Sequence, residues 1–389
     1  MLANRIKNLE PSPTLAIDAK VRDLVRKGKE IANLGVGEPN FATPKYICDA
    51  AREAIREGFT HYTPAGGIPE LRMEIAEYLR KKNNLNYSPE EIMVGAGSKS
   101  ILYNLFQILC DPDDEVIITT PTWGTYFEQI KLSGALPVEI PLLPPFKLQA
   151  ENLRNKITAK TKVILLNSPS NPTGAIIDEV ELKKIGELAV KKNLYIVVDE
   201  IYGQMTYGNK RCVSIASLGE EIKKRTITVN GFSKSFAMTG WRVGFAAGPK
   251  EIIEVAIALQ GQTTFANSSI SQKAALTALQ GKDDEVKKMQ TEFTARHDYL
   301  TKELAGIDGI DFTEPDGAFY FFVSIKNLLS TKYPTSAAWC EGLLDKEQVA
   351  VVPGEAFHAP GYFRLSYGAA LDEVKKGVEG IKRFIRSSP

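Results

Sequence analysis

Short apolar runs alternate with longer amphipathic segments over most of the chain. The apolar runs predict seven strands, at residues 92–94, 115–119, 136–140, 162–166, 194–198, 226–229 and 242–246. Between several of them, apolar residues recur with the period of a helix, at residues 99–109, 126–132 and 179–192. Strands that alternate with helices favour an α/β fold, in which helices cover both faces of a mostly parallel seven-stranded sheet.

The pattern changes after about residue 282. A long charged helix is predicted at residues 285–304, and two further helices are predicted at 335–344 and 371–385. Strands are predicted at residues 317–325, 349–353 and 362–367. This stretch indicates a second, smaller α+β unit.

Composition narrows the class of protein. The 389 residues are enough for two or three domains, and the apolar share of 43% with 24% charged residues is ordinary for a soluble globular protein. The 48 basic residues nearly balance the 47 acidic ones, so no broad basic surface for nucleic acid or anionic lipid is expected. The first 15 residues carry Arg5, Lys7 and Glu10 without an apolar core, and no apolar run approaches the roughly 20 residues that span a bilayer. We therefore expect a cytoplasmic protein with no nucleic-acid or membrane partner.

The residues that usually bind metals are scattered. No Cys-x-x-Cys pair occurs, so neither a metal site nor a disulfide framework is predicted, and a reducing compartment is favoured. The residues concerned are Cys48, Cys110, Cys212, Cys340, His61, His297 and His358.

Lys234 is the most informative single residue. It follows the predicted strand 226–229 in a segment of small and hydroxylated residues, where a ligand could approach closely. Arg242 follows eight positions later between Trp241 and Val243, where an unpaired charge would be costly. An isolated lysine in such a place is usually a surface residue, so the interpretation depends on two further segments.

The first of these is the end of the predicted strand 194–198, where Asp199 and Tyr202 lie three positions apart. The second is the proline-rich turn at residues 167–174, which follows another strand and contains Asn171. Together with Lys234 they offer an amine, an acid for a ring nitrogen, donors for a ring hydroxyl and, with Arg242, a cation for phosphate. These are the groups that the chemistry of pyridoxal 5'-phosphate (PLP) requires.

Four motifs occur in a familiar order and spacing: Gly37-Glu38-Pro39 and residues 168–174, 199–202 and 233–244. From about Pro11 to about Arg386 the chain resembles the class I aminotransferases of fold type I, in particular the bacterial and archaeal aspartate aminotransferase group. The resemblance implies a large PLP-binding domain at residues 45–285 and a discontinuous small domain at 13–44 and 286–389, after an N-terminal arm at 1–12.

The resemblance also implies roles for the residues around the cofactor. Lys234 would bind the cofactor covalently and then move a proton as a general base. Asp199 would face the ring nitrogen, Tyr202 and Asn171 would hydrogen-bond the ring oxygen, and Trp123 would stack on the ring. From the residues alone, Trp123 and Tyr202 could equally be core aromatics.

The segment Gly97-Ser98-Lys99-Ser100 follows one predicted strand and opens a helix, so its amides and hydroxyls can face an anion. It is not a nucleotide P-loop, because Met93 and Ser98 stand where that motif needs glycine. Ser233 and Arg242 would complete the phosphate site.

Tyr62 matches a tyrosine that reaches the phosphate from the neighbouring subunit in the family. The resemblance thus implies a homodimer with shared active sites. By itself, Tyr62 would be interpreted as a loop aromatic.

Substrate recognition is expected at Arg364, which would bind the substrate α-carboxylate, with Gly37, Asn171 and Trp123 beside it. A lone arginine there could also be an exposed residue of an edge strand. Lys99 matches a lysine that contacts the distal carboxylate in the family's aspartate aminotransferases.

Two further positions bear on specificity. Ser12 and Thr14 match hydroxyl residues near the pocket for the distal carboxylate. Relatives that accept prephenate carry a lysine where this chain has Glu10, which argues against that substrate.

The expected function is a PLP-dependent transamination between aspartate and 2-oxoglutarate by a ping-pong mechanism. An aromatic or kynurenine aminotransferase and a PLP-dependent β-lyase remain the alternatives. A regulator built on this scaffold is disfavoured, because no basic recognition helix is present in the sequence.

Overall fold

The computed structural model describes residues 3–7, 9, 11, 13–281 and 284–387. The positions of Glu10 and Ser12, and part of the predicted N-terminal arm, lie outside the described residues. The helices are α1 (Asn4–Lys7), α2 (Pro13–Arg26), α3 (Lys45–Arg56), α4 (Pro69–Asn83), α5 (Ser98–Leu109), α6 (Thr125–Leu132), α7 (Ala150–Arg154), α8 (Glu179–Lys192), α9 (Glu220–Lys223), α10 (Lys250–Gln262), α11 (Ser269–Gln280), α12 (Asp284–Ala305), α13 (Ser336–Glu347) and α14 (Leu371–Ser387). The strands are β1 (Ala32–Asn33), β2 (Ile92–Gly95), β3 (Glu115–Thr120), β4 (Leu136–Pro141), β5 (Thr161–Asn167), β6 (Tyr195–Asp199), β7 (Thr226–Gly231), β8 (Gly244–Ala247), β9 (Asp311–Phe312), β10 (Tyr320–Ser324), β11 (Val349–Ala350), β12 (Val352–Pro353) and β13 (Tyr362–Ser366).

Seven strands form the large sheet, in the order β2-β8-β7-β6-β5-β3-β4. Five of them, β3 to β7, pair in parallel, whereas β8 is antiparallel to both β2 and β7. The predicted mostly parallel, seven-stranded sheet is therefore confirmed. One boundary was wrong: the last strand begins at Gly244, so Arg242 lies in the preceding loop with a φ of 53°.

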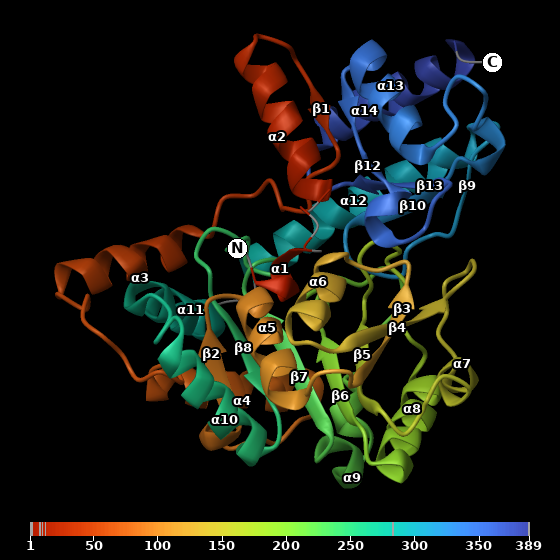
Figure 1. Ribbon diagram of the computed structural model, residues 1–389. Coiled ribbons are helices and arrows are strands. Elements are labelled where there is room, and N and C mark those ends of the chain that lie inside the picture. Colours follow the sequence, from red (N-terminus) through yellow and green to blue (C-terminus); the bar gives the residue numbers. More distant parts are fainter. Residues whose placement is uncertain (1–2, 8, 10, 12, 282–283, 388–389) are drawn as a thin grey trace.

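Helices cover both faces of the large sheet (Figure 1). Successive residues of β3, β5 and β6 alternate between two cores, as the pleat of a strand requires. One core packs the sheet against α5, α6 and α10, and it includes Val116, Ile118, Val163, Leu165 and Val197. The opposite core packs the same strands against α7 and α8, and it includes Ile117, Ile164, Leu166, Ile196 and Val198. Burial on both faces explains why these strands read as nearly continuous apolar runs.

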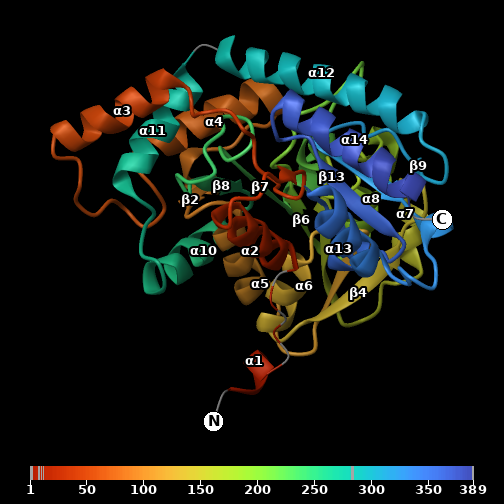
Figure 2. The same ribbon diagram turned by 90° about the horizontal axis from the view of Figure 1, so that it is seen from above.

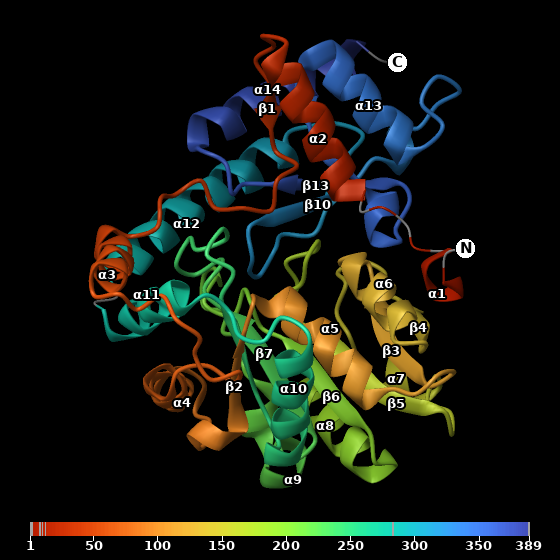
Figure 3. The same ribbon diagram turned by 60° about the vertical axis from the view of Figure 1, so that its left-hand side comes forward.

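The small sheet contains the antiparallel strands β12, β13, β10 and β9 in that order. Its core packs against α12 and α14, and in Figure 3 helix α2 crosses in front of it. The predicted strand at residues 349–353 is in fact two strands, because β11 pairs with β1 and β12 pairs with β13. Figure 2 shows α12 along one edge of the molecule, from the neighbourhood of α11 to that of β9.

The pairing of β1 with β11 brings residues 32–33 beside residues 349–350. This contact is of the kind that the predicted discontinuous small domain requires, and the domain boundaries themselves stay a prediction. In the part of the chain that the structure describes, no helix is long and apolar enough to cross a membrane.

Candidate active site

A cavity of about 590 Å³ lies where the parallel strands β5, β6 and β7 end. Its walls come from segments far apart in the sequence. Its place beyond the carboxyl ends of the strands is the usual position of ligand sites in such sheets. Most of the predicted site residues line it, namely Gly37, Ser98, Lys99, Trp123, Asn171, Asp199, Tyr202, Ser233, Lys234, Arg242 and Arg364.

Lys234 reaches the cavity because β7, which precedes it, is buried along its whole length and ends at Gly231. The ammonium nitrogen of Lys234 donates a hydrogen bond of 2.6 Å to the carbonyl oxygen of Gly37. Burial, opposed by the carboxylate of Glu38, lowers the pKa of Lys234 to about 8. This amine therefore loses its proton more readily than a free lysine side chain does.

Asp199 is the last residue of β6, and its side chain is almost fully buried. One carboxylate oxygen accepts a hydrogen bond of 2.8 Å from the hydroxyl of Tyr126, and the other accepts one of 3.1 Å from the amide of Ile201. Burial raises the pKa of Asp199 to about 6, although the bond from Tyr126 opposes the rise. The site therefore holds a buried acid that a nearby cation would stabilise in its ionised form.

Arg364 projects from β13 and is only 3% exposed. Its guanidinium donates to the side-chain oxygen of Asn171 at 3.0 Å and to the carbonyl oxygen of Gly35 at 2.5 Å. Its Nε is buried without a hydrogen-bond partner, and no carboxylate among the described residues forms an ion pair with it. Because an unpaired buried charge is costly, this guanidinium is well suited to an anionic ligand.

Two tyrosine rings complete the wall around Arg364. The hydroxyl of Tyr202 lies 2.7 Å from that of Tyr320, and the guanidinium carbon of Arg364 lies 4.5 Å from the centre of the Tyr320 ring. The hydroxyl of Tyr320 would lie 2.6 Å from a Cβ at position 37, so only glycine allows this approach. This geometry gives a physical reason for Gly37.

The predicted phosphate residues surround the N-terminus of α5. Gly97 has a φ of 82°, and a Cβ built on it would lie 2.5 Å from a terminal nitrogen of Arg242. The hydroxyl of Ser98 donates to the carbonyl oxygen of Asn230 at 3.0 Å. Arg242 is exposed rather than buried between apolar neighbours, and it donates to the carbonyl oxygen of Thr239 at 2.8 Å. Arg242 is therefore not the buried charge that its apolar neighbours predicted, although its position beside Gly97 suits anion binding.

Lys99 and Trp123 lie together at the cavity, with the Lys99 ammonium 4.7 Å from the centre of the indole ring. Trp123 also meets the ring of Tyr126 edge to face, with 5.2 Å between the ring centres. Thr14 lines the same cavity.

The structure does not bring Tyr62 to this cavity. Its side chain is 90% exposed, and its ring packs edge to face on Phe265 with 4.9 Å between the ring centres. Gly97 does not line the cavity itself but lies directly behind Arg242.

Sequence reasoning missed Tyr126 and Tyr320. Tyr126 lies 73 positions from its partner Asp199, and Tyr320 lies 118 positions from Tyr202. No local pattern connects residues so far apart. The sequence placed Glu38 in a motif but predicted no role for it. In the structure it accepts a hydrogen bond from the hydroxyl of Thr239 beside Lys234.

Comparisons with known proteins identify the family of this chain. The sequence profile of the family "Aminotransferase class I and II" matches residues 29–381. The aspartate aminotransferase of Bacillus subtilis (strain 168) is 44% identical over 387 residues, which cover 99% of this chain and 98% of that protein. The probable aspartate/prephenate aminotransferase of Aquifex aeolicus (strain VF5) is 44% identical over 388 residues, covering 99% and 98%.

Solved structures give the same result. The aspartate aminotransferase from Thermus thermophilus with maleate superposes with a TM-score of 0.93 at 38% identity, over 99% of both chains. The enzyme from Rhizobium meliloti gives a TM-score of 0.95 at 39% identity, also over 99% of both chains. The expected fold type is confirmed, and the chain belongs to the class I and II aminotransferases.

Proposed function

We propose that this enzyme transfers the amino group of aspartate to 2-oxoglutarate in two half-reactions, with PLP as its cofactor. The observation that carries the proposal is the buried guanidinium of Arg364, which has no described carboxylate partner and lines the same cavity as Lys234 and Asp199. The family and the relatives named aspartate aminotransferase support this choice of substrates.

The residues present fit PLP. The cavity volume of about 590 Å³ lies within the usual range for small-molecule sites. The buried carboxylate of Asp199 would hold the ring nitrogen, Tyr202 and Asn171 the ring hydroxyl, and the Gly97–Arg242 corner with Ser98 and Ser233 the phosphate. When bound, PLP supplies an aldehyde that reacts with amines and a ring that withdraws electrons from the substrate Cα.

The chain itself supplies binding and proton transfer. Arg364 would hold the α-carboxylate with two parallel hydrogen bonds and so fix the orientation of the Cα–H bond. Lys234, with its pKa lowered to about 8, would accept the proton from the substrate Cα and return it to C4′ of the cofactor.

The four cysteines are free, which suits the reducing cytoplasm that we propose for the enzyme.

We expect Lys99→Ala to lower kcat/KM for aspartate and glutamate about 10- to 100-fold, because a charge-assisted hydrogen bond to the distal carboxylate is lost. Alanine, which has no distal carboxylate, should be used as well as before. The rates at which each of the three donors converts the bound PLP to its amine form, measured without a 2-oxo acid, test this. Lys131→Ala on α6 removes an exposed lysine that pairs with Glu128 and serves as the control. An equal loss for alanine would contradict the role of Lys99, and a wild type inactive on aspartate would refute the proposed substrate.

We also propose a homodimer in which Tyr62 of each subunit reaches the phosphate of the other. The exposed tyrosine ring and its neighbour Phe265, itself 42% exposed, are available for such a contact.

Tyr62→Phe is therefore expected to weaken PLP binding about tenfold while the protein stays a dimer, since only one hydrogen bond to an anion is removed. Absorbance titration with PLP and analytical ultracentrifugation measure the two quantities. Tyr103→Phe on α5 removes a hydroxyl from a residue that is 36% exposed and should change neither. Unchanged PLP affinity in Tyr62→Phe would refute the shared site.

A further inference from the structure

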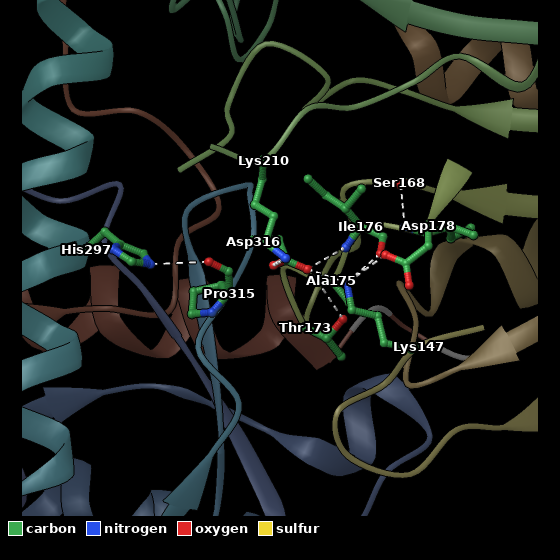
Figure 4. Close-up of polar contacts among 11 residues, drawn as sticks. Lys147, Ser168, Thr173, Ala175, Ile176, Asp178, Lys210, His297, Pro315 and Asp316 are labelled. Carbon is green, nitrogen blue, oxygen red and sulfur yellow. Dashed lines mark hydrogen bonds and ion pairs between the residues drawn. The ribbon is translucent and has the colours of Figure 1, made fainter. Parts of the chain in front are cut away.

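A group of charged residues lies outside the cavity, between two segments that are far apart in the sequence. We call it the Asp316 cluster, and it contains Asp316, Lys147, Lys210 and Asp178 (Figure 4). One carboxylate oxygen of Asp316 lies 2.5 Å from the ammonium of Lys147, and the other lies 3.2 Å from that of Lys210. Lys147 also lies 3.7 Å from Asp178.

The central pair is partly buried. The side chain of Asp316 is 14% exposed and that of Lys147 is 27% exposed, whereas Lys210 is 57% exposed. Burial alone would raise the pKa of Asp316, but the hydrogen bond and charge of Lys147 lower it overall, so the carboxylate is ionised at neutral pH. Water screens such a pair less than it screens a surface ion pair.

Both partners also contact the backbone of Ile176. The amide of Ile176 donates to Asp316 at 3.3 Å, and its carbonyl oxygen accepts a hydrogen bond of 2.8 Å from Lys147 (Figure 4). The pair therefore connects the loop that contains Asp316 to the end of the turn at residues 168–176.

The two segments pack without space for a side chain. The amide of Gly317 donates to the carbonyl oxygen of Gly174 at 2.9 Å. Gly174 has a φ of 68°, and a Cβ built on it would lie 2.3 Å from that of Pro315. On the other side, the carbonyl oxygen of Pro315 lies 3.2 Å from Nε2 of the buried His297.

Each connected segment leads directly to Arg364. The turn at residues 168–176 contains Asn171, whose side-chain oxygen accepts from the guanidinium at 3.0 Å. The chain after Asp316 enters β10 at Tyr320, whose ring lies under the same guanidinium. The Asp316 cluster thus fixes the two segments that orient Arg364.

We propose that Asp316 is a positioning residue for substrate binding: its ion pair with Lys147 holds Asn171 and Tyr320 around Arg364 and so sets the affinity for the α-carboxylate of amino acids and 2-oxo acids. This inference rests on the proposed function of Arg364. It does not depend on which amino acid is preferred, because every amino donor carries the α-carboxylate.

The test is Asp316→Asn, which keeps the size of the side chain and removes its charge. We expect KM to rise about tenfold for both the amino donor and the 2-oxo acid, with kcat lowered less than threefold and the absorbance of bound PLP unchanged. A higher KM with nearly constant kcat is the signature of lost ground-state and transition-state binding alike. Lys147→Met should raise KM in the same way, and the double variant should add little to either single variant, because each single variant already breaks the ion pair.

Glu303→Gln is the matched control. Glu303 pairs with Lys382 at 2.6 Å, and their side chains are 26% and 19% exposed, so a similar ion pair is lost away from the turn. Its KM values should equal those of the wild type even if the melting temperature falls. A wild-type KM in Asp316→Asn, or an equal rise in Glu303→Gln, overturns the inference.

Each variant is assayed with the donor that the wild type uses best. A wild type that prefers another donor refutes only the proposed specificity for aspartate. A wild type that accepts no amino acid overturns the proposed function and this inference together.

Discussion

Lys234→Ala is expected to lower kcat about 10⁴-fold, the upper end of the range for loss of a general base, because the same amine also binds the cofactor. The visible absorbance of the lysine-bound cofactor should disappear. Lys234→Arg should be equally inactive, since a guanidinium keeps the charge but neither binds the aldehyde nor accepts a proton at neutral pH. Absorbance spectra and stopped-flow rates with aspartate measure both effects.

Whereas Lys234→Ala lowers activity, it should raise the stability of the cofactor-free protein. The pKa of Lys234 falls from 10.5 to about 8 on folding, so between these values the unfolded chain binds more protons than the folded one. Burial of the ammonium therefore lowers stability below pH 8, and this cost decreases as the pH rises toward 10.5. Cofactor-free Lys234→Ala should be at least as stable as the wild type at pH 7, with its advantage shrinking above pH 8.

Lys273→Ala is the control for the absorbance and kcat measurements. Lys273 lies on α11 outside the cavity, and its ammonium is 4.7 Å from the centre of the Phe59 ring. Its removal should leave the spectrum and kcat unchanged. Turnover by Lys234→Ala at more than a hundredth of the wild-type rate would contradict the assignment.

Arg364→Met is expected to raise the activation free energy by about 2–4 kcal/mol, which lowers kcat/KM about 30- to 1000-fold for every amino donor. The loss should not depend on the side chain of the donor, because the guanidinium would bind the α-carboxylate. Arg364→Lys should recover only part of the activity, since an ammonium cannot form two parallel hydrogen bonds. The rates at which aspartate, glutamate and alanine each convert the bound PLP to its amine form, measured without a 2-oxo acid, test this.

A second buried arginine gives a physical contrast. Arg296 is also 3% exposed, but it donates to Asn40 at 2.8 Å and to the carbonyl oxygen of Ala369 at 2.7 Å, among other acceptors. Arg296→Met should lower the melting temperature because these acceptors lose their donor. Arg364→Met should lower the melting temperature less, since only Asn171 and Gly35 lose a donor and a buried charge without a carboxylate partner is removed. A marked loss of stability in Arg364→Met would indicate a structural role instead.

The strands of the large sheet could be predicted from sequence because both of their faces are buried. Each strand then appears as a short apolar run, as in the fully buried β7. The antiparallel direction of β8 could not be predicted, because an apolar run has no direction. The same limit explains the error at Arg242, where apolar neighbours suggested a strand that begins two residues later.

The site residues could be predicted where they follow strands or belong to motifs, as Asp199 and Lys234 do. Tyr126 and Tyr320 could not, because each is defined by one long-range hydrogen bond. Their own segments show only aromatic residues that would suit a core equally well. The ion pair between Asp316 and Lys147 could not be predicted either, because the two residues lie 169 positions apart.

The most direct measurement is borohydride reduction of the enzyme with PLP bound, followed by digestion and mass spectrometry of the peptides. Reduction makes the bond between lysine and cofactor permanent, so the modified residue can be identified. We expect the pyridoxyl group on Lys234, and its loss after aspartate is added without a 2-oxo acid. Modification of another lysine instead, or no modification at all, would show that Lys234 does not bind the cofactor.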